Sequence, residues 1–302
     1  GFQTMSTRNI QPTYFDATNQ PAKTFLSPKK HFEVLTWTGN GSNGNVITGL
    51  EFKPDFIWAK CRSNGHDNQI INSITGTTKY TSSNRNDTST ASDRITSINN
   101  DGFTLGSDAR LNENSATNVA WCWKAGGISN TFNVDGKGYT TAAAAGITDG
   151  STALTGASVN TEAGFSMITY TGTGSATTVG HGLGAKPDWI LFRNRNDEGH
   201  GWNVYHSSIG ATKNLQLQTN ASVATASNKF NNTEPTSTVI TVNTAADTNQ
   251  SGQNFIAYCW TAIPGYSKFG TYTGNGSTDG TYVHLGFRPA LVLFKSTSAS
   301  EN

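Results

Sequence analysis

The sequence predicts an all-β protein built of tandem β-sandwich domains, jelly-roll-like or concanavalin A-like in architecture. Apolar and polar residues alternate in short segments, and no segment longer than about ten residues has the 3.6-residue period of a helix. Threonine, aromatic and β-branched residues favour strands, while glycine and asparagine favour turns. Aromatic residues make up 10% of the chain. Because a single sheet with one polar face could not bury so many of them, two packed sheets are expected in each domain.

One phrase occurs three times and opens three similar units. It reads TWTGNG at 36–41, TYTGTG at 169–174 and TYTGNG at 271–276. An alternating strand leads into each phrase, the Gly-x-Gly supplies a turn, and a proline then begins a short apolar strand such as PDFIWAK or PDWILFR. The first two units also end alike, in NVAWCWK and NFIAYCW. This pattern predicts about eight strands in about 100 residues per unit.

These matches divide the chain into five segments. The first β-sandwich is predicted over 31–127, the second over 164–265, and the start of a third over 266–302. Residues 1–30 contain three prolines and predict an extended lead-in. Residues 128–163 are rich in Ala, Gly, Ser and Thr, which predicts a linker, an exposed insertion, or strands that form only by pairing with neighbouring chains. Since the third unit stops in mid-unit, the chain is expected to be a fragment of a longer protein.

The composition argues against several classes of partner and cofactor. The formal net charge is +1 and only 14% of the residues are charged, so a clustered basic face for nucleic acid is not expected. No apolar run approaches the ~20 residues of a membrane span. The three cysteines form neither a disulfide framework nor a zinc spacing, and no helix follows the glycine-rich loops to bind phosphate. We therefore predict no metal site and no cofactor.

The segment GHGWNVYHSS at 199–208 contains the candidate ligand-binding residues, His200, Trp202, Tyr205 and His206. Tryptophan and tyrosine combine an apolar face with a polar group, so this set could stack on a sugar and hydrogen-bond to it. The same alternation also fits a strand that places some of these residues in a core. Unit one has HDNQIINSITG at the equivalent position, without the aromatic residues. This difference between the units favours a local function.

Two sets of residues have the residue types of a catalytic site, and neither predicts an enzyme. His206 with Ser207 or Ser208 and Asp197 has the residue types of a hydrolase triad, but sequence neighbours do not supply its geometry and no Gly-x-Ser-x-Gly motif is present. A glycosidase would need two carboxylates about 5 to 9.5 Å apart. Asp55 and Asp188 follow equivalent prolines, and the third unit has alanine at this position. A role as a turn or strand cap therefore explains these two carboxylates better than a catalytic role. The candidate carboxylates are Glu33, Asp55, Asp67, Asp188, Asp197 and Glu198.

Several of these phrases together resemble a repeated domain of unassigned function found in virion proteins of tailed phages, especially marine phages. Unit two carries the resemblance through TYTGTG, HGLGAKPDWILFRNR, WNVYHSSIGATKNLQLQT and FIAYCW. Unit one carries it through TWTGNG, GLEFKPDFIWAK, NDGFTLGSD and NVAWCWKAGG. The opening GFQTMSTRNIQP is similar to the trailing edge of a SPRY-like sandwich. The Ala-rich residues 140–145 depart from the spacer expected of such proteins.

The resemblance implies a structural protein of the virion, such as a tail fibre or surface appendage. It would be assembled in the host cytoplasm and lie on the outer surface or tail, with other virion proteins as partners and a trimer as the usual oligomer of the class. Attachment to a host-surface glycan is a further expectation. The resemblance implies no reaction. A carbohydrate-binding module array without a virion role and a polysaccharide-degrading tailspike remain open as alternatives.

Overall fold

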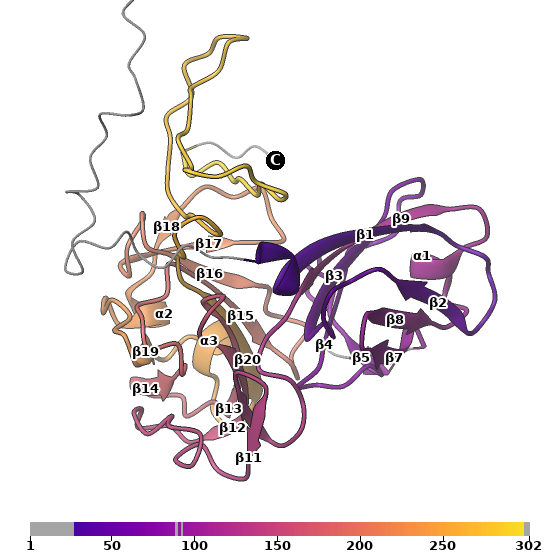
Figure 1. Ribbon diagram of the computed structural model, residues 1–302. Coiled ribbons are helices and arrows are strands. Elements are labelled where there is room, and N and C mark those ends of the chain that lie inside the picture. The colour runs from indigo at the N-terminus through magenta and orange to yellow at the C-terminus, as the bar shows by residue number, and fades with distance from the viewer. Residues whose placement is uncertain (1–26, 88–89, 92, 299–302) are drawn as a thin grey trace, which may run out of the picture.

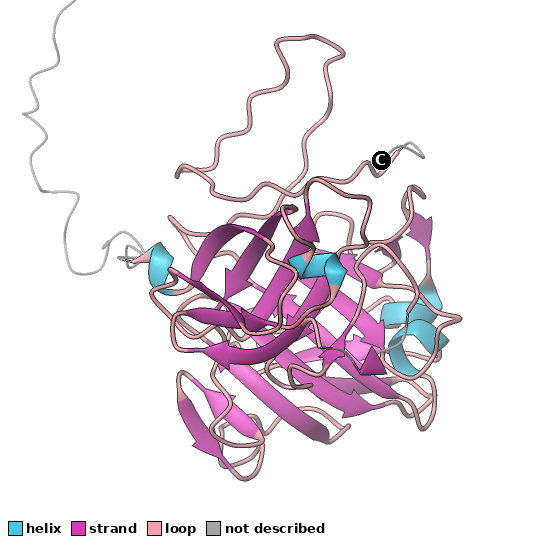
Figure 2. Cartoon of the chain, turned by 90° about the vertical axis from the view of Figure 1, so that its right-hand side faces the viewer, coloured by secondary structure: helices cyan, strands magenta, loops and turns pink. Residues whose placement is uncertain are grey.

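The computed structural model describes residues 27–87, 90–91 and 93–298. The predicted lead-in lies outside the described residues except for 27–30, where a single 3-10 turn, η3 (Pro28–Lys30), precedes the first strand. The described chain forms two β-sandwiches that lie side by side, unit one on the right and unit two on the left of Figure 1. Its three described α-helices, each one turn long, lie between strands (Figure 2). The predicted all-β, β-sandwich class is confirmed.

Unit one contains a four-stranded inner sheet and a three-stranded outer sheet, all of whose pairs are antiparallel. In order, the inner sheet is β1 (Phe32–Thr38), β9 (Thr117–Trp123), β3 (Phe56–Cys61) and β4 (Gln69–Asn72). The outer sheet is β2 (Asn45–Thr48), β8 (Gly102–Leu105) and β7 (Ile95–Asn99). The remaining elements are a small pair, β5 (Lys79–Tyr80) with β6 (Thr90–Ala91), and helix α1 (Ala109–Asn112).

Unit two has the same plan with a larger inner sheet. In order, its strands are β11 (Lys137–Tyr139), β10 (Phe132–Val134), β12 (Leu154–Asn160), β13 (Phe165–Thr171), β20 (Asn254–Trp260), β15 (Trp189–Asn194), β16 (Asn203–His206), β17 (Lys213–Gln216) and β18 (Ala224–Thr225). The outer sheet is β14 (Thr177–Gly180) with β19 (Val239–Val242). The helices are α2 (Ser227–Phe230) and α3 (Ala246–Asn249).

The segment 128–163, predicted as a linker, an insertion or a partner-dependent strand, instead adds strands to unit two. β12 pairs antiparallel with β13, and β10 pairs parallel with β12. Its small residues are used in close packing: Ala157 and Ser158 are fully buried, and the Ser158 hydroxyl accepts from the backbone N–H of Gly126 at 2.9 Å. The segment therefore joins the units as part of the sheet, and the small residues of β12 are in tight contact there.

Side chains alternate strictly between two cores along the central strands. In β9, Ala120 and Cys122 point into the core between the two sheets of unit one, whereas Trp121 and Trp123 point the other way. The strands of unit two alternate likewise between that unit's own core and the same middle space. The predicted period-2 pattern is thus correct. Because both faces of each inner sheet are covered, alternate side chains of one strand enter two different cores.

A layer of aromatic side chains fills the space between the two inner sheets. Phe165 stacks on Trp260 with ring centroids 4.8 Å apart, and Phe56 meets Tyr258 edge-on at 4.8 Å. We call this set the aromatic layer, and its central members are Phe56, Trp123, Phe165, Tyr258 and Trp260. Aromatic pairs in such geometries add about 0.5–1.5 kcal/mol beyond their buried area. The two units therefore share a core.

Residues 266–298, predicted to start a third unit, contain no strand in the structure. Tyr282 and Phe294 of this segment are 84% and 73% exposed, and part of the segment projects away from the sandwiches (Figures 1 and 2), although Phe269 and Leu291 pack against the cluster between the two inner sheets. The topology explains this. In unit one, the first strand β1 and the third strand β3 do not pair with each other, and both pair with the last strand, β9. In unit two, β13 and β15 are joined in the same way by β20. Within the described chain both of these last strands are already paired on each side.

His181, next to β14, is a fully buried imidazole whose two ring nitrogens are both satisfied. Nδ1 accepts from the backbone N–H of Leu183 at 3.2 Å, and Nε2 lies 3.3 Å from the carbonyl oxygen of Thr236. This arrangement fits the neutral ring with its proton on Nε2. Burial lowers the pKa of His181 to about 4. The unfolded chain takes up this proton near pH 6.5, so the stability associated with the neutral ring is lost as the pH falls from 6.5 to 4.

We expect His181 to lower the free energy of unfolding by about 2 kcal/mol between pH 7 and pH 5. Urea titrations of the wild-type chain and of His181→Gln at both pH values measure this contribution. The glutamine cannot titrate, so the variant should lose about 2 kcal/mol less than the wild type over the same interval. Equal losses in the two proteins would contradict the assignment.

Candidate functional site

The repeated Gly-x-Gly phrase is a loop held by one buried asparagine in each unit. In unit two the side chain of Asn249 in α3 accepts from the backbone N–H of Thr173 at 2.8 Å and donates to the carbonyl of Ser175 at 2.7 Å. Gly172 permits the close approach, since a Cβ there would lie 2.2 Å from the carbonyl oxygen of Gln250. A buried amide with its partners satisfied fixes a backbone and offers nothing to a ligand.

The same loop in unit one is built in the same way. The side chain of Asn112 in α1 accepts from the backbone N–H of Asn40 at 3.0 Å and donates to the carbonyl of Ser42 at 2.8 Å. Asn112 and Asn249 are both fully buried. The sequence TxTGxG thus identifies an architectural loop, and the asparagine about 75 residues later that completes it could not be recognised as its partner from one sequence.

The two aspartates that follow the equivalent prolines tie strand ends together within their own units. Asp188 accepts from the Ser207 hydroxyl at 2.9 Å and from the backbone N–H of Ala262 at 2.8 Å. Asp55 accepts from the Ser73 hydroxyl and from the backbone after β9 in the matching way. Burial raises the pKa of Asp55, while its hydrogen bonds oppose that rise. Each carboxylate acts as a cap, as the sequence suggested, and these hydrogen bonds occupy both oxygens.

The predicted sugar-binding residues do not form one surface. Trp202 and Tyr205 are buried on opposite faces of the sheet, Trp202 against the aromatic layer and Tyr205 in the core of unit two. The Tyr205 hydroxyl donates to Glu234, and burial is the largest cause of its raised pKa. The residues expected to stack on a sugar are therefore core residues. The strand interpretation of this segment describes them correctly.

The two histidines of the same segment, His200 and His206, are partly exposed and contact different partners. His200 is close to Asp197, with Nε2 and the carboxylate oxygen 3.5 Å apart. His206 accepts from the backbone N–H of Ser208, and burial lowers its pKa. Ser207 donates to Asp188 instead of to a histidine. The triad considered for these residues is not assembled.

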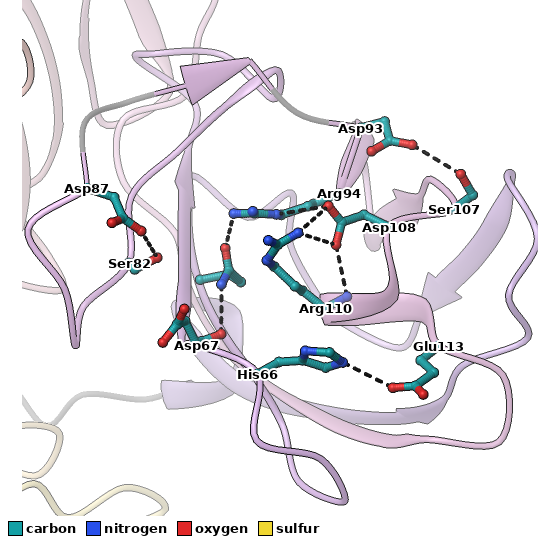
Figure 3. Close-up of polar contacts among 11 residues, drawn as sticks. His66, Asp67, Ser82, Asp87, Asp93, Arg94, Ser107, Asp108, Arg110 and Glu113 are labelled. Atoms are coloured by element: carbon teal, nitrogen blue, oxygen red, sulfur yellow. Dashed lines mark hydrogen bonds and ion pairs between the residues drawn. The ribbon is translucent and has the colours of Figure 1, made fainter.

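A polar cavity of about 280 Å³ lies where unit one meets a loop of unit two. We call it the boundary pocket. It lies beside the ion pairs of unit one drawn in Figure 3, where Arg94 and Arg110 both point toward Asp108 and Ser82 contacts Asp87. Glu198 is the contribution of unit two. The residues that line it are Asp67, Tyr80, Ser82, Arg85, Asp87, Arg94, Arg110 and Glu198.

Arg94 forms the fixed part of the boundary pocket. Its side chain is 4% exposed, and its guanidinium donates to the Gln69 side chain and to Asp108, the latter at 3.3 Å. The same guanidinium lies 3.1 Å from the centroid of the Tyr80 ring, which covers that ring. A buried cation held by a carboxylate, an amide and an aromatic face has one orientation.

The exposed rim of the boundary pocket is a network around Arg85. Arg85 donates to Asp67 and to Asp87, both at 3.1 Å, and the Ser82 hydroxyl donates to Asp87 at 3.1 Å. The two carboxylates raise the pKa of Arg85 further. Because Arg85 is exposed and its ion pairs are screened by water, this rim contributes little to stability and its groups can exchange partners.

Unit two anchors the loop that carries this rim. The indole N–H of Trp202 donates to the carbonyl of Ser82 at 2.8 Å, and the guanidinium of Arg193 donates to the carbonyl of Asp87. Trp202 is thus related to the candidate site, but as a buried support behind the loop. Trp202 stands out in the sequence because unit one has no tryptophan at the equivalent position. The sequence gives no sign of the loop 82–87 that Trp202 holds in place.

A second concave surface is a shallow groove beside the loop of unit two. It has a volume of about 530 Å³ and is lined by Ser151, Thr152, Ala153, Leu154, Thr155, Thr171, Thr173, Ser175, Ala176 and Thr177. It contains no charged side chain. In the described part of the chain, no group of three or more His, Cys, Asp or Glu residues could hold a metal ion. No described helix is long and apolar enough to cross a membrane.

We expect Trp202→Phe to loosen the boundary pocket while leaving the sheet intact. The phenyl ring retains packing against the aromatic layer, but the Ser82 carbonyl loses its indole donor, which costs about 1–3 kcal/mol of unfolding free energy. Hydrogen exchange followed by mass spectrometry should show faster exchange in residues 82–87 with β16 unchanged. Faster exchange spread through β16, or none at 82–87, would contradict this anchoring role.

Comparison with known proteins matches one family over all of the described residues. The match spans residues 27–302 and therefore includes both sandwiches and the segment after them. Comparison with curated proteins and with solved structures finds no match. The chain belongs to the family described as Domain of unknown function (DUF7483).

Proposed function

We propose that this chain is a structural module of a tailed-phage virion, in a tail fibre or surface appendage, that also contacts a glycan of the host surface. The observation that carries the proposal is that two groups of polar residues in the chain have different roles. Those that the two units share hold loops and strand ends, as Asn112, Asn249, Asp55 and Asp188 do. Charged residues of unit one, joined by Glu198 of unit two, gather at the boundary pocket.

The sequence resemblance supports the virion part of the proposal. The phrases that resemble phage virion proteins correspond to the loops and central strands of both sandwiches. A module in which two sandwiches share one core suits an extended appendage, since contact through the aromatic layer limits motion between the units. Other virion proteins would be its partners, and a trimer is the assembly expected of the class.

The site chemistry supports a non-catalytic role. Of the carboxylates considered for glycoside hydrolysis, Asp55 and Asp188 act as caps, while Asp67 and Asp197 are in ion pairs with arginine and histidine. A hydrolase needs one carboxyl with a raised pKa close to a second ionised one in a cleft that admits substrate. Asp55, whose pKa is raised, instead lies buried at the end of a strand.

The test uses a phage whose genome encodes this chain. Gold-labelled antibodies raised against the purified chain should mark the tail or surface of intact particles in electron micrographs, and the purified chain should slow adsorption of the phage to its host. Particles without label would contradict the virion assignment. A carbohydrate-binding array without a virion role would bind glycans and leave particles unlabelled, and a tailspike enzyme would release oligosaccharides from host polysaccharide.

A further inference from the structure

The exposed rim of the boundary pocket belongs to unit one and has no counterpart in unit two, although unit two has a similar buried network in which Lys229 and Asn203 donate to Asp247. Aligned through Ser73 and Ser207, which cap equivalent aspartates, Asp67 of unit one corresponds to Gly201. Aligned through the loop-holding asparagines, Arg110 corresponds to Asp247. The fold itself therefore does not require the exposed charges of the pocket, because unit two has the same plan without them, whereas a buried cation–carboxylate pair is present in both units.

The lining groups are balanced in charge and complementary in hydrogen bonding. Three guanidinium groups, from Arg85, Arg94 and Arg110, can only donate. Three carboxylates, from Asp67, Asp87 and Glu198, can only accept when ionised. A phosphate, a sulfate or an acidic sugar would meet repulsion from the carboxylates, and a cation would meet the guanidinium groups. A neutral ligand that both donates and accepts fits this lining best.

The cavity also limits the size and shape of its ligand. Its volume of about 280 Å³ lies just below the ~300–1,000 Å³ of pockets that hold drug-sized molecules. The Tyr80 ring is covered by Arg94, and Trp202 is buried behind the loop. Recognition would therefore depend on hydrogen bonds and not on stacking of a flat aromatic ligand. A compact polyhydroxylated ring meets these conditions.

We infer that the boundary pocket binds one neutral sugar residue of a glycan, through its hydroxyl groups. This inference rests on the glycan contact of the proposed function and names its site and ligand class. Arg94 is held in place by Asp108 and Gln69 and offers a fixed surface. Arg85 and Glu198 are exposed and approach the ligand from the rim. Vicinal hydroxyls bridge a guanidinium donor and a carboxylate acceptor in such a site.

Saturation-transfer NMR and calorimetry test the inference on the full chain. The probes are the neutral sugars glucose, galactose, mannose and N-acetylglucosamine, and the acidic sugars glucuronic acid and N-acetylneuraminic acid. At least one neutral sugar should bind. Arg85→Gln and Glu198→Gln should each weaken its binding about tenfold or more, because each removes a charged hydrogen-bond partner. Glu51→Gln, on an exposed residue of unit one outside the pocket, is the matched control and should bind like the wild type.

Three results would overturn the inference: binding of acidic sugars only, neutral-sugar binding that both pocket variants leave unchanged, or no binding of any sugar. Thermal unfolding of each variant shows whether it is folded, and both substituted side chains lie at the surface. Failure here together with labelled virions removes the ligand assignment and keeps the structural role. Sugar binding in the pocket together with unlabelled virions keeps the site and removes the virion role.

Discussion

The aromatic layer between the two inner sheets is the contact on which the rest of the structure depends. Phe56 and Trp123 of unit one meet Phe165, Tyr258 and Trp260 of unit two, with ring centroids 4.8 to 6.5 Å apart across the boundary. Because both faces of each inner sheet are covered, strand side chains alternate between two apolar surroundings. The same layer places the loop 82–87 of unit one against Trp202 and Arg193 of unit two, and so forms the boundary pocket.

The sequence was sufficient for the class of fold and for the repeating unit. Alternation in segments such as FSMITYTG is a local property, and the three Gly-x-Gly phrases are a local similarity, so both can be recognised without coordinates. The structure of residues 128–163 could not be recognised in this way. Its Ala, Gly and Ser residues read as a flexible spacer, yet Ala157 and Ser158 are buried because small side chains allow β12 to lie close to the end of unit one.

The candidate site shows the limit of sequence reasoning more clearly. The difference between the units at Trp202 can be recognised in the sequence, but the burial of Trp202 depends on which face of the sheet meets the partner sheet, and that is a long-range contact. The boundary pocket draws its lining from residues between 67 and 198 that no spacing rule brings together. The third unit is similar: PALVLFK has the pattern of a strand, and pairing decides whether it becomes one.

The central claim is that the two units share one core and fold as one cooperative structure. Pulsed hydrogen exchange with mass spectrometry along a urea titration tests it most directly, because peptides from β3 and β9 report on unit one and peptides from β13 and β15 report on unit two. We predict that both sets lose protection at the same urea concentration, as a two-state transition requires. Loss of protection in one unit at a clearly lower concentration than in the other would contradict the claim.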